Sequence, residues 1–161
     1  MKFSKILMAL PLSLLSVSAI AGMADINGST KCTIVDSIIK NKAIVKACTY
    51  EGAVGGSMSY AISQLSFKLS NGNIYRTVDN ATFDFGKGGQ VQNLKETVLL
   101  NGKTAEVVRL NHKTFKKISD KDIESRYENI NPDFSDVLQC FKYVKQDAAF
   151  CVSYEFINRI S

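Results

Sequence analysis

The sequence of 161 residues lacks tryptophan altogether and has only one histidine and two prolines. The histidine, His112, lies among lysines, and nothing near it points to a serine–histidine–aspartate triad or to a histidine-based zinc site. The chain also has no C-x-x-C pair, so thioredoxin-like redox chemistry has no support. These absences predict a protein that is not an enzyme and that uses neither a metal nor a cofactor.

Three short matches to known motifs lack the context that those motifs need. The D-F-G tripeptide at 84–86 stands without the rest of a kinase signature, and G-K-G-G at 86–89 lacks the spacing of a phosphate-binding loop. Asp120, Asp122 and Glu124 lack the glycine and the ligand spacing of a calcium loop. Two of the fifteen acidic residues could still meet in space as a catalytic pair, but the sequence singles out no such pair.

The N-terminus has the organisation of a secretory signal peptide. Lys2 and Lys5 provide the charged region, residues 6–15 form a short apolar run, and residues 19–21 form an A-x-A cleavage signal. The apolar run is shorter than the roughly 20 residues of a membrane-spanning helix, which disfavours the alternative of an uncleaved anchor. We therefore expect cleavage after Ala21, with a second possible cut after Ala24.

The mature chain, residues 22–161, is expected to be a single domain that is periplasmic or secreted. The 161 residues minus the 21 removed leave 140, and the loss of Lys2 and Lys5 lowers the net charge from +5 to +3. That charge does not indicate a nucleic-acid partner, which requires a dense basic face. No segment after the cleavage site is apolar enough to cross a membrane.

Four cysteines in an exported chain indicate two disulfides. Cys32 and Cys48 are symmetric about position 40, so a hairpin there would place them opposite each other. Cys140 and Cys151 are likewise symmetric about the 145–146 bond. We predict the pairs Cys32–Cys48 and Cys140–Cys151, each stabilising the fold by roughly 2–4 kcal/mol, with free buried thiols as the alternative.

Segments rich in β-branched and aromatic residues lie on both sides of each predicted disulfide turn. Residues 33–39 and 43–49 are expected to be strands around the first turn, and residues 137–143 and 149–156 around the second. Residues 25–31 are small and polar and are expected to be a loose lead-in.

Two Asn-Gly pairs predict hairpins with type I′ turns. Around Asn101-Gly102, the expected register places Leu99 opposite Thr104 and Thr97 opposite Glu106.

Around Asn71-Gly72, the expected register gathers the large aliphatic residues on one face, by pairing Leu69 with Ile74, Phe67 with Arg76 and Leu65 with Val78. The opposite, polar face would carry Ser66, Lys68, Ser70, Asn73, Tyr75 and Thr77.

One helix is predicted, from Asp120 to Asn129. Ser119 is a suitable N-cap, and Asp122 three residues later completes a pattern like a capping box. The chain as a whole is therefore predicted to be mainly β: a small antiparallel barrel or a curved sheet built from hairpins, with one short helix packed on it.

The glycine-containing stretch from Tyr50 to Tyr60 is the candidate partner-binding segment. Loops on a rigid scaffold commonly carry function, and this stretch combines glycines with aromatic, acidic and hydroxyl side chains. A bulge or a bend where the sheet curves is the alternative, and we favour it. The candidate contact residues are Tyr50, Glu51, Gly52, Gly55, Gly56, Met58 and Tyr60.

A basic stretch is the other candidate surface. We interpret it as an ordinary solvated face, with a patch for an anionic partner as the alternative. Its cations are Lys87, Lys95, Lys103, Arg109, Lys113, Lys116, Lys117 and Lys121.

Export, a disulfide-stapled scaffold and the lack of a catalytic set together predict a binding protein that acts by protein–protein contact, in the cell envelope or outside the cell. The chain is similar in size, compartment and build to small exported lysozyme inhibitors, but it lacks their signature segments. The specific hypothesis is an inhibitor or immunity protein against an envelope-attacking enzyme. The alternatives are a structural or adhesive envelope component, and a small ligand carrier or hydrolase whose site is not visible in the sequence.

Protein exported from cells and purified without reductant should begin at Gly22 and contain both disulfides. Intact mass spectrometry should then give the mass of residues 22–161 less the hydrogens lost on forming two bridges. Retention of Met1, or the mass of the fully reduced chain, would contradict the prediction.

Overall fold

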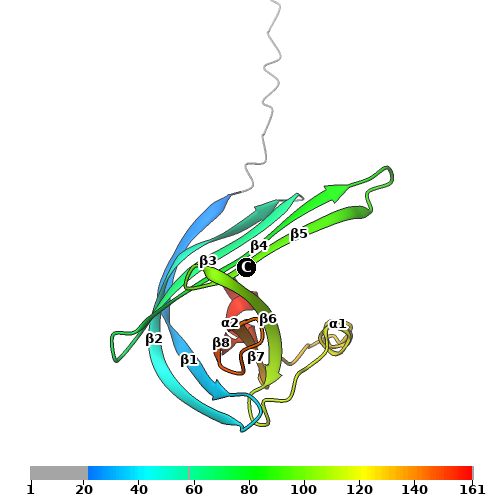
Figure 1. Cartoon of the computed structure of the whole chain (residues 1–161). Helices are drawn as coiled ribbons and strands as arrows, with labels where there is room; N and C mark the ends of the chain where they lie inside the picture. The colour runs from blue at the N-terminus through cyan, green and yellow to red at the C-terminus, as the bar shows by residue number, and fades with distance from the viewer. Residues whose placement is uncertain (1–21, 58, 161) are drawn as a thin grey trace, which may run out of the picture.

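The computed structural model describes residues 22–57 and 59–160; the predicted signal peptide and Met58 lie outside the described residues. Eight antiparallel strands pair in chain order, and the last returns to the first to close a barrel (Figure 1). The prediction of a mainly β fold with a small barrel is confirmed. The strands are β1 (Met23–Ser37), β2 (Lys42–Ser57), β3 (Tyr60–Leu69), β4 (Ile74–Phe85), β5 (Val91–Leu100), β6 (Lys103–Asn111), β7 (Val137–Tyr143) and β8 (Ala149–Ser153); the helices are α1 (Asp120–Tyr127) and α2 (Tyr154–Ile160).

Helix α2 lies inside the barrel, whereas α1 lies outside it (Figure 1). Phe156 of α2 is 3% exposed, and its ring centroid lies 4.7 Å from that of Tyr50 and 6.2 Å from that of Phe67. Side chains must fill the interior of an eight-stranded barrel, and α2 supplies several of them. The predicted strand at 149–156 is therefore wrong beyond Ser153: both edges of β8 are already paired, and the remaining apolar residues enter the interior as a helix.

The structure has one core inside the barrel, a second outside β6–β8, and a third, smaller one beneath α1 that contains Ile123, Phe134, Val137 and Tyr154. Phe115 covers the outer face of these strands, so β7 is buried on both faces. The inner core contains Cys32, Cys48, Val54, Leu65, Phe67, Leu69, Leu100, Ala105, Phe141, Phe150, Val152, Phe156 and Ile157, and the outer core contains Val35, Val108, Leu110, Phe115, Leu138, Cys140, Ala149 and Cys151.

Both predicted disulfides are present. Cys140 lies directly opposite Cys151, as expected. Cys32 and Cys48 do not face each other directly, because the turn at 38–41 sets a register two residues away from the symmetric one. That bridge runs diagonally across the strand pair, with a Cα–Cα distance of 5.9 Å.

The hairpin at Asn71-Gly72 forms as predicted, but its turn is one residue longer. Leu69 N donates to Asn73 O and Gly72 N donates to Leu69 O, each at 2.9 Å, which encloses a three-residue loop. Gly72 has φ 86°, the left-handed conformation that such a loop needs at its last residue.

This longer loop shifts the register by one residue and exchanges the two faces of β4. Phe67 pairs with Tyr75, so Tyr75 and Thr77 face the barrel interior instead of solvent. Tyr75 stacks on Phe150 with ring centroids 4.5 Å apart. The predicted register for this hairpin is therefore wrong, because tertiary packing places the aromatic side chain inside.

The hairpin at Asn101-Gly102 has the predicted register and turn. The two turn residues have φ of 51° and 77°, and Leu99 pairs with Thr104. Pairing ends there, however, so the expected pair of Thr97 and Glu106 does not form.

The segment from Tyr50 to Ser57 is part of β2 and pairs with β1 and β3, so it does not form the loop of the partner-binding hypothesis. This pairing agrees with the structural interpretation that we favoured. A Cβ at Gly52 would lie 2.0 Å from Gln64 O, and one at Gly55 would lie 2.5 Å from Gly22 O. These glycines let neighbouring backbones approach closely, which is a structural role. Residues 25–31 also form part of a paired strand. They belong to β1 and pair with β2, so the prediction of a loose lead-in is wrong.

Helix α1 begins as predicted and ends at Tyr127. Ser119 Oγ accepts from Asp122 N, and Asp122 Oδ2 accepts from Ser119 N, so the capping box is complete. Within the described residues, no helix has both the length and the apolar character needed to span a membrane.

Phe156→Ala should lower the free energy of unfolding by about 3–5 kcal/mol, because it opens a cavity where α2 fills the barrel. Glu155→Ala, at an exposed position of the same helix, should change it by less than about 0.5 kcal/mol. Denaturant unfolding of both variants measures the difference. A change in the free energy of unfolding for Phe156→Ala as small as that for Glu155→Ala would show that α2 does not support the barrel.

Candidate binding cleft

A cleft of about 610 Å³ lies where β5 and β6 separate. These two strands share only two residue pairs next to their turn and then diverge (Figure 1). The cleft is lined by Asp79, Glu96, Thr97, Val98, Leu99, Thr104, Ala105, Glu106, Val107, Arg109 and Asp120.

Asp79 lies at the inner side of this cleft. Thr77 faces the interior, and the strand period of two places Asp79 on the same face of β4. The buried Gln139 side chain of β7, which is 5% exposed, reaches across the barrel and donates from Nε2 to Asp79 Oδ2 at 3.4 Å. Asp79 thus has a neutral hydrogen-bond donor as its partner.

The environment of Asp79 disfavours its charged form. Burial raises the pKa of Asp79 above its ordinary value of 3.8, and the nearby negative charge of Glu96 raises it further. The positive charge of Arg109 acts in the opposite direction and does not cancel these two effects.

Arg109 of β6 forms the cationic side of the cleft. Its Nη1 donates to Asp120 Oδ1 at 2.5 Å, and its guanidinium carbon lies 5.3 Å from the ring centroid of Tyr154. Burial raises the pKa of Tyr154 to about 12, with a contribution from its hydrogen bond with Tyr127. The line along which β5 and β6 separate is called the seam. Arg109 connects this seam to the first residue of each helix, Asp120 of α1 and Tyr154 of α2.

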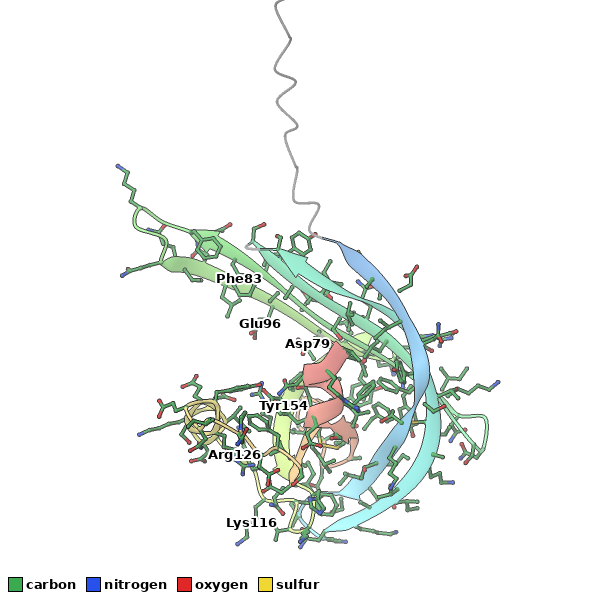
Figure 2. The ribbon with its side chains drawn as sticks, turned by 180° about the vertical axis from the view of Figure 1, so that it is seen from behind. Asp79, Phe83, Glu96, Lys116, Arg126 and Tyr154 are labelled. Carbon is green, nitrogen blue, oxygen red and sulfur yellow. A yellow bond between two sulfur atoms is a disulfide. The ribbon has the colours of Figure 1, made fainter. Side chains whose placement is uncertain are left out.

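Two carboxylates of the cleft have charged partners and two do not. Glu106 pairs with Lys142, and Asp120 pairs with Arg109. Among residues 22–57 and 59–160, no ion pair includes Asp79 or Glu96. Figure 2 shows both side chains on the β4–β5 hairpin, on the side that faces α2. The cleft thus presents net negative charge to anything that enters it.

Helix α1 borders this region and is held to the barrel by the buried Ile123, which packs against Tyr154, and by polar contacts. Arg126 forms an ion pair with Asp136, which lowers the pKa of that carboxyl. The hydroxyl of Tyr127 lies 3.3 Å from that of Tyr154 and accepts from Asn158 Nδ2 at 2.7 Å. These contacts fix α1 relative to α2.

The candidate contact residues of the 50–60 segment do not gather on one surface. Tyr50 packs inward on Phe156, whereas Glu51, the next residue along β2, is exposed. Glu51 and Tyr50 border a separate cavity of about 480 Å³ together with Lys68 and Ile74. Of the remaining candidates, Gly52, Gly55, Gly56 and Tyr60 lie in the paired strands β2 and β3, and Met58 lies outside the described residues.

The basic stretch divides in two. Arg109 is drawn into the cleft, whereas His112 and Lys113, Lys116 and Lys117 are exposed on the segment after β6. In the part of the chain that the structure describes, no group of three or more His, Cys, Asp or Glu side chains is placed to hold a metal ion.

Sequence reasoning missed Asp79, Glu96 and Gln139. The expected register put the Tyr75 face of β4 in solvent, and Asp79 shares that face. For Glu96 the strand period gives the position: it lies two residues before Val98 and four before the buried Leu100, so all three share the inner face of β5. Comparison of the chain with protein-family models, curated proteins and solved structures found no match.

Asp79→Asn should stabilise the protein at neutral pH. Because the folded-state pKa of Asp79 is raised, ionisation costs stability as the pH rises from 3.8 through the folded-state pKa, and the amide removes that cost. Thermal unfolding should show a higher midpoint than the parent at neutral pH and no difference well below pH 3.8.

Asp120→Asn is the matched control, because it removes a carboxylate that has a cationic partner. Its unfolding midpoint should not rise. An unchanged or lower midpoint for Asp79→Asn at neutral pH would contradict the account of Asp79.

Proposed function

We propose that the protein is an exported, non-enzymatic binding protein that holds a protein partner through the cleft between β5 and β6. The observation that supports this is the presence of two carboxyl groups, Asp79 and Glu96, that form no ion pair with a described residue and lie in a cleft of ligand-binding size. The two disulfides are consistent with an oxidising compartment, periplasmic or extracellular, as the place of contact.

The partner's contact group would be a lysine or arginine side chain. A cation between Asp79 and Glu96 would relieve their mutual repulsion and lower the pKa of Asp79 on binding. Such charge complementarity contributes mainly to specificity and to the rate of association. The most specific form of the proposal is an inhibitor or immunity protein against an envelope-attacking enzyme that inserts a basic side chain.

A hydrolase is the second candidate function, and one observation favours it. A carboxyl group with a raised pKa beside a second carboxylate is an arrangement suited to general acid catalysis. Asp79 would be the acid and Glu96 the base or nucleophile.

Immobilised residues 22–161 should retain a partner from envelope extract, and the double variant Asp79→Asn, Glu96→Gln should lose it by at least about tenfold, since two charge-assisted contacts disappear. Glu51→Gln, on an exposed position of β2, is the control and should retain the partner. If the double variant keeps the partner and Glu51→Gln loses it, the contact lies at the 50–60 segment and not in the cleft.

The retention should also depend on pH. A cation stabilises the ionised form of Asp79, so retention is complete above the raised pKa of free Asp79 and falls as the pH drops through it. Elution by a descending pH gradient measures this, with Asp79→Asn as the variant that lacks the response. A pH response identical in both proteins would exclude Asp79 from the contact.

A cell-wall turbidity assay separates the inhibitor from the hydrolase. Purified protein should slow clearing by an added peptidoglycan-degrading enzyme and cause no clearing alone. Clearing by the protein alone, lost in Asp79→Asn, would favour the hydrolase. Self-association in size-exclusion chromatography with no effect on clearing would favour a structural or adhesive component.

A further inference from the structure

The seam leaves one edge of β5 without a neighbouring strand. On its other side β5 pairs with β4 over almost its whole length, from Leu100 opposite Thr77 to Val91 opposite Phe85. Toward β6 it pairs only at Leu99 and Leu100. Among the described residues, no strand pairs with this side of β5 from Val91 to Val98.

The hairpin turn determines which main-chain groups face the cleft. In a two-residue type I′ hairpin the flanking residues, here Leu100 and Lys103, exchange hydrogen bonds with each other. Because main-chain groups alternate along a strand, those of Leu94, Glu96 and Val98 point to the same edge as those of Leu100. The main-chain groups of the residues in between point to β4. Asn101 N, for example, donates to Arg76 O at 2.7 Å.

The facing edge of β6 is partly covered by the chain itself. Ile118 N donates to Arg109 O at 2.8 Å, and Asn111 N donates to Lys116 O at 2.9 Å, so segment 116–118 runs beside the end of β6. Nearer the turn, the same parity directs the main-chain groups of Ala105 and Val107 into the cleft. The protein thus protects one side of its seam and leaves β5 open.

We propose that an extended segment of the protein partner adds to this edge of β5 as an additional strand, with basic side chains directed toward Asp79 and Glu96. This mode rests on the proposed function and specifies how the partner is held. Main-chain hydrogen bonds to the edge provide affinity for any extended segment, and side-chain pockets select among sequences.

Charge selects the occupant. The cleft is lined by four carboxylates and one arginine, so basic side chains at alternate positions of the added strand complement it. Pairing of β5 with β5 of a second copy is disfavoured by Lys95 on the exposed part of the strand, because edge lysines oppose self-association.

Hydrogen exchange tests the open edge directly. In the free protein, the amides of Leu94, Glu96 and Val98 should exchange faster than those of Lys95 and Thr97, which face β4. Equal protection of the two sets would overturn the assignment of an open edge.

A matched pair of variants tests strand addition. Leu94→Pro removes an amide donor at the open edge of β5, whereas Leu94→Ala removes the side chain and keeps the donor. The probe is a short fluorescent peptide of alternating lysine and valine, and binding is followed by fluorescence anisotropy. The parent and Leu94→Ala should bind it, and Leu94→Pro should bind at least about tenfold more weakly.

Two altered probes keep the test decisive if Leu94→Pro does not fold. A peptide with glutamate in place of lysine should not bind. The lysine–valine peptide can also be methylated on every second backbone nitrogen, which gives two different peptides. The one whose methyl groups lie toward β5 should not bind, because it lacks the donors for that edge. Equal binding of the methylated and unmethylated peptides would overturn strand addition, as would absence of binding of the lysine–valine peptide to the parent.

The outcomes distinguish this inference from the proposed function. If Leu94→Pro keeps the natural partner while Asp79→Asn, Glu96→Gln loses it, the cleft binds a partner but not by strand addition. If the natural partner is unaffected by either change, the proposed function fails as well. A dimer of the parent that Leu94→Pro converts to a monomer would make the occupant a second copy and overturn the inference.

Discussion

The packing of α2 inside the barrel is the interaction on which the rest of the structure depends. Phe156 meets Phe67 and Tyr50 across the interior, within the core that the inner faces of the strands form. Since α2 follows β8 without a connecting loop, its first residue is held at the seam, where Tyr154 stacks beneath Arg109. The element that fills the barrel therefore also positions the cation of the cleft.

Two features of the seam between β5 and β6 lower the stability of the barrel. Hydrogen bonding between β5 and β6 ends after two residue pairs, and Asp79 is half-buried without an ion pair. Gln139 gives that carboxyl one hydrogen-bond donor, but burial and Glu96 still raise its pKa. Groups with such perturbed pKa values concentrate at functional sites, because binding or chemistry compensates for their cost. An open strand edge beside these carboxyls is a second unsatisfied feature at the same location.

One turn shows how a local prediction can be right in kind and wrong in consequence. Asn71-Gly72 does mark a hairpin, but a third residue in the loop shifts the register. An alternating pattern of Tyr75, Thr77 and Asp79 resembles a solvent face, and only the stacking of Tyr75 on Phe150, far along the chain, reveals that it faces inward. Because of this one-residue shift in register, the sequence did not place Asp79 in the cleft. The β5–β6 turn has the expected register, yet no local pattern indicates that its strands separate.

The sequence by itself determined the features that depend on neighbours along the chain. The symmetric cysteine pairs, the two Asn-Gly turns and the capping box of α1 each involve residues close in sequence, so their chemistry is visible in the order of residues. Only the tertiary structure decided which face of β4 is buried, that residues 154–160 form α2, and that Asp79 lies near Glu96 and accepts a hydrogen bond from Gln139. These outcomes depend on filling one closed interior with side chains from distant strands, and that packing requirement has no local signature.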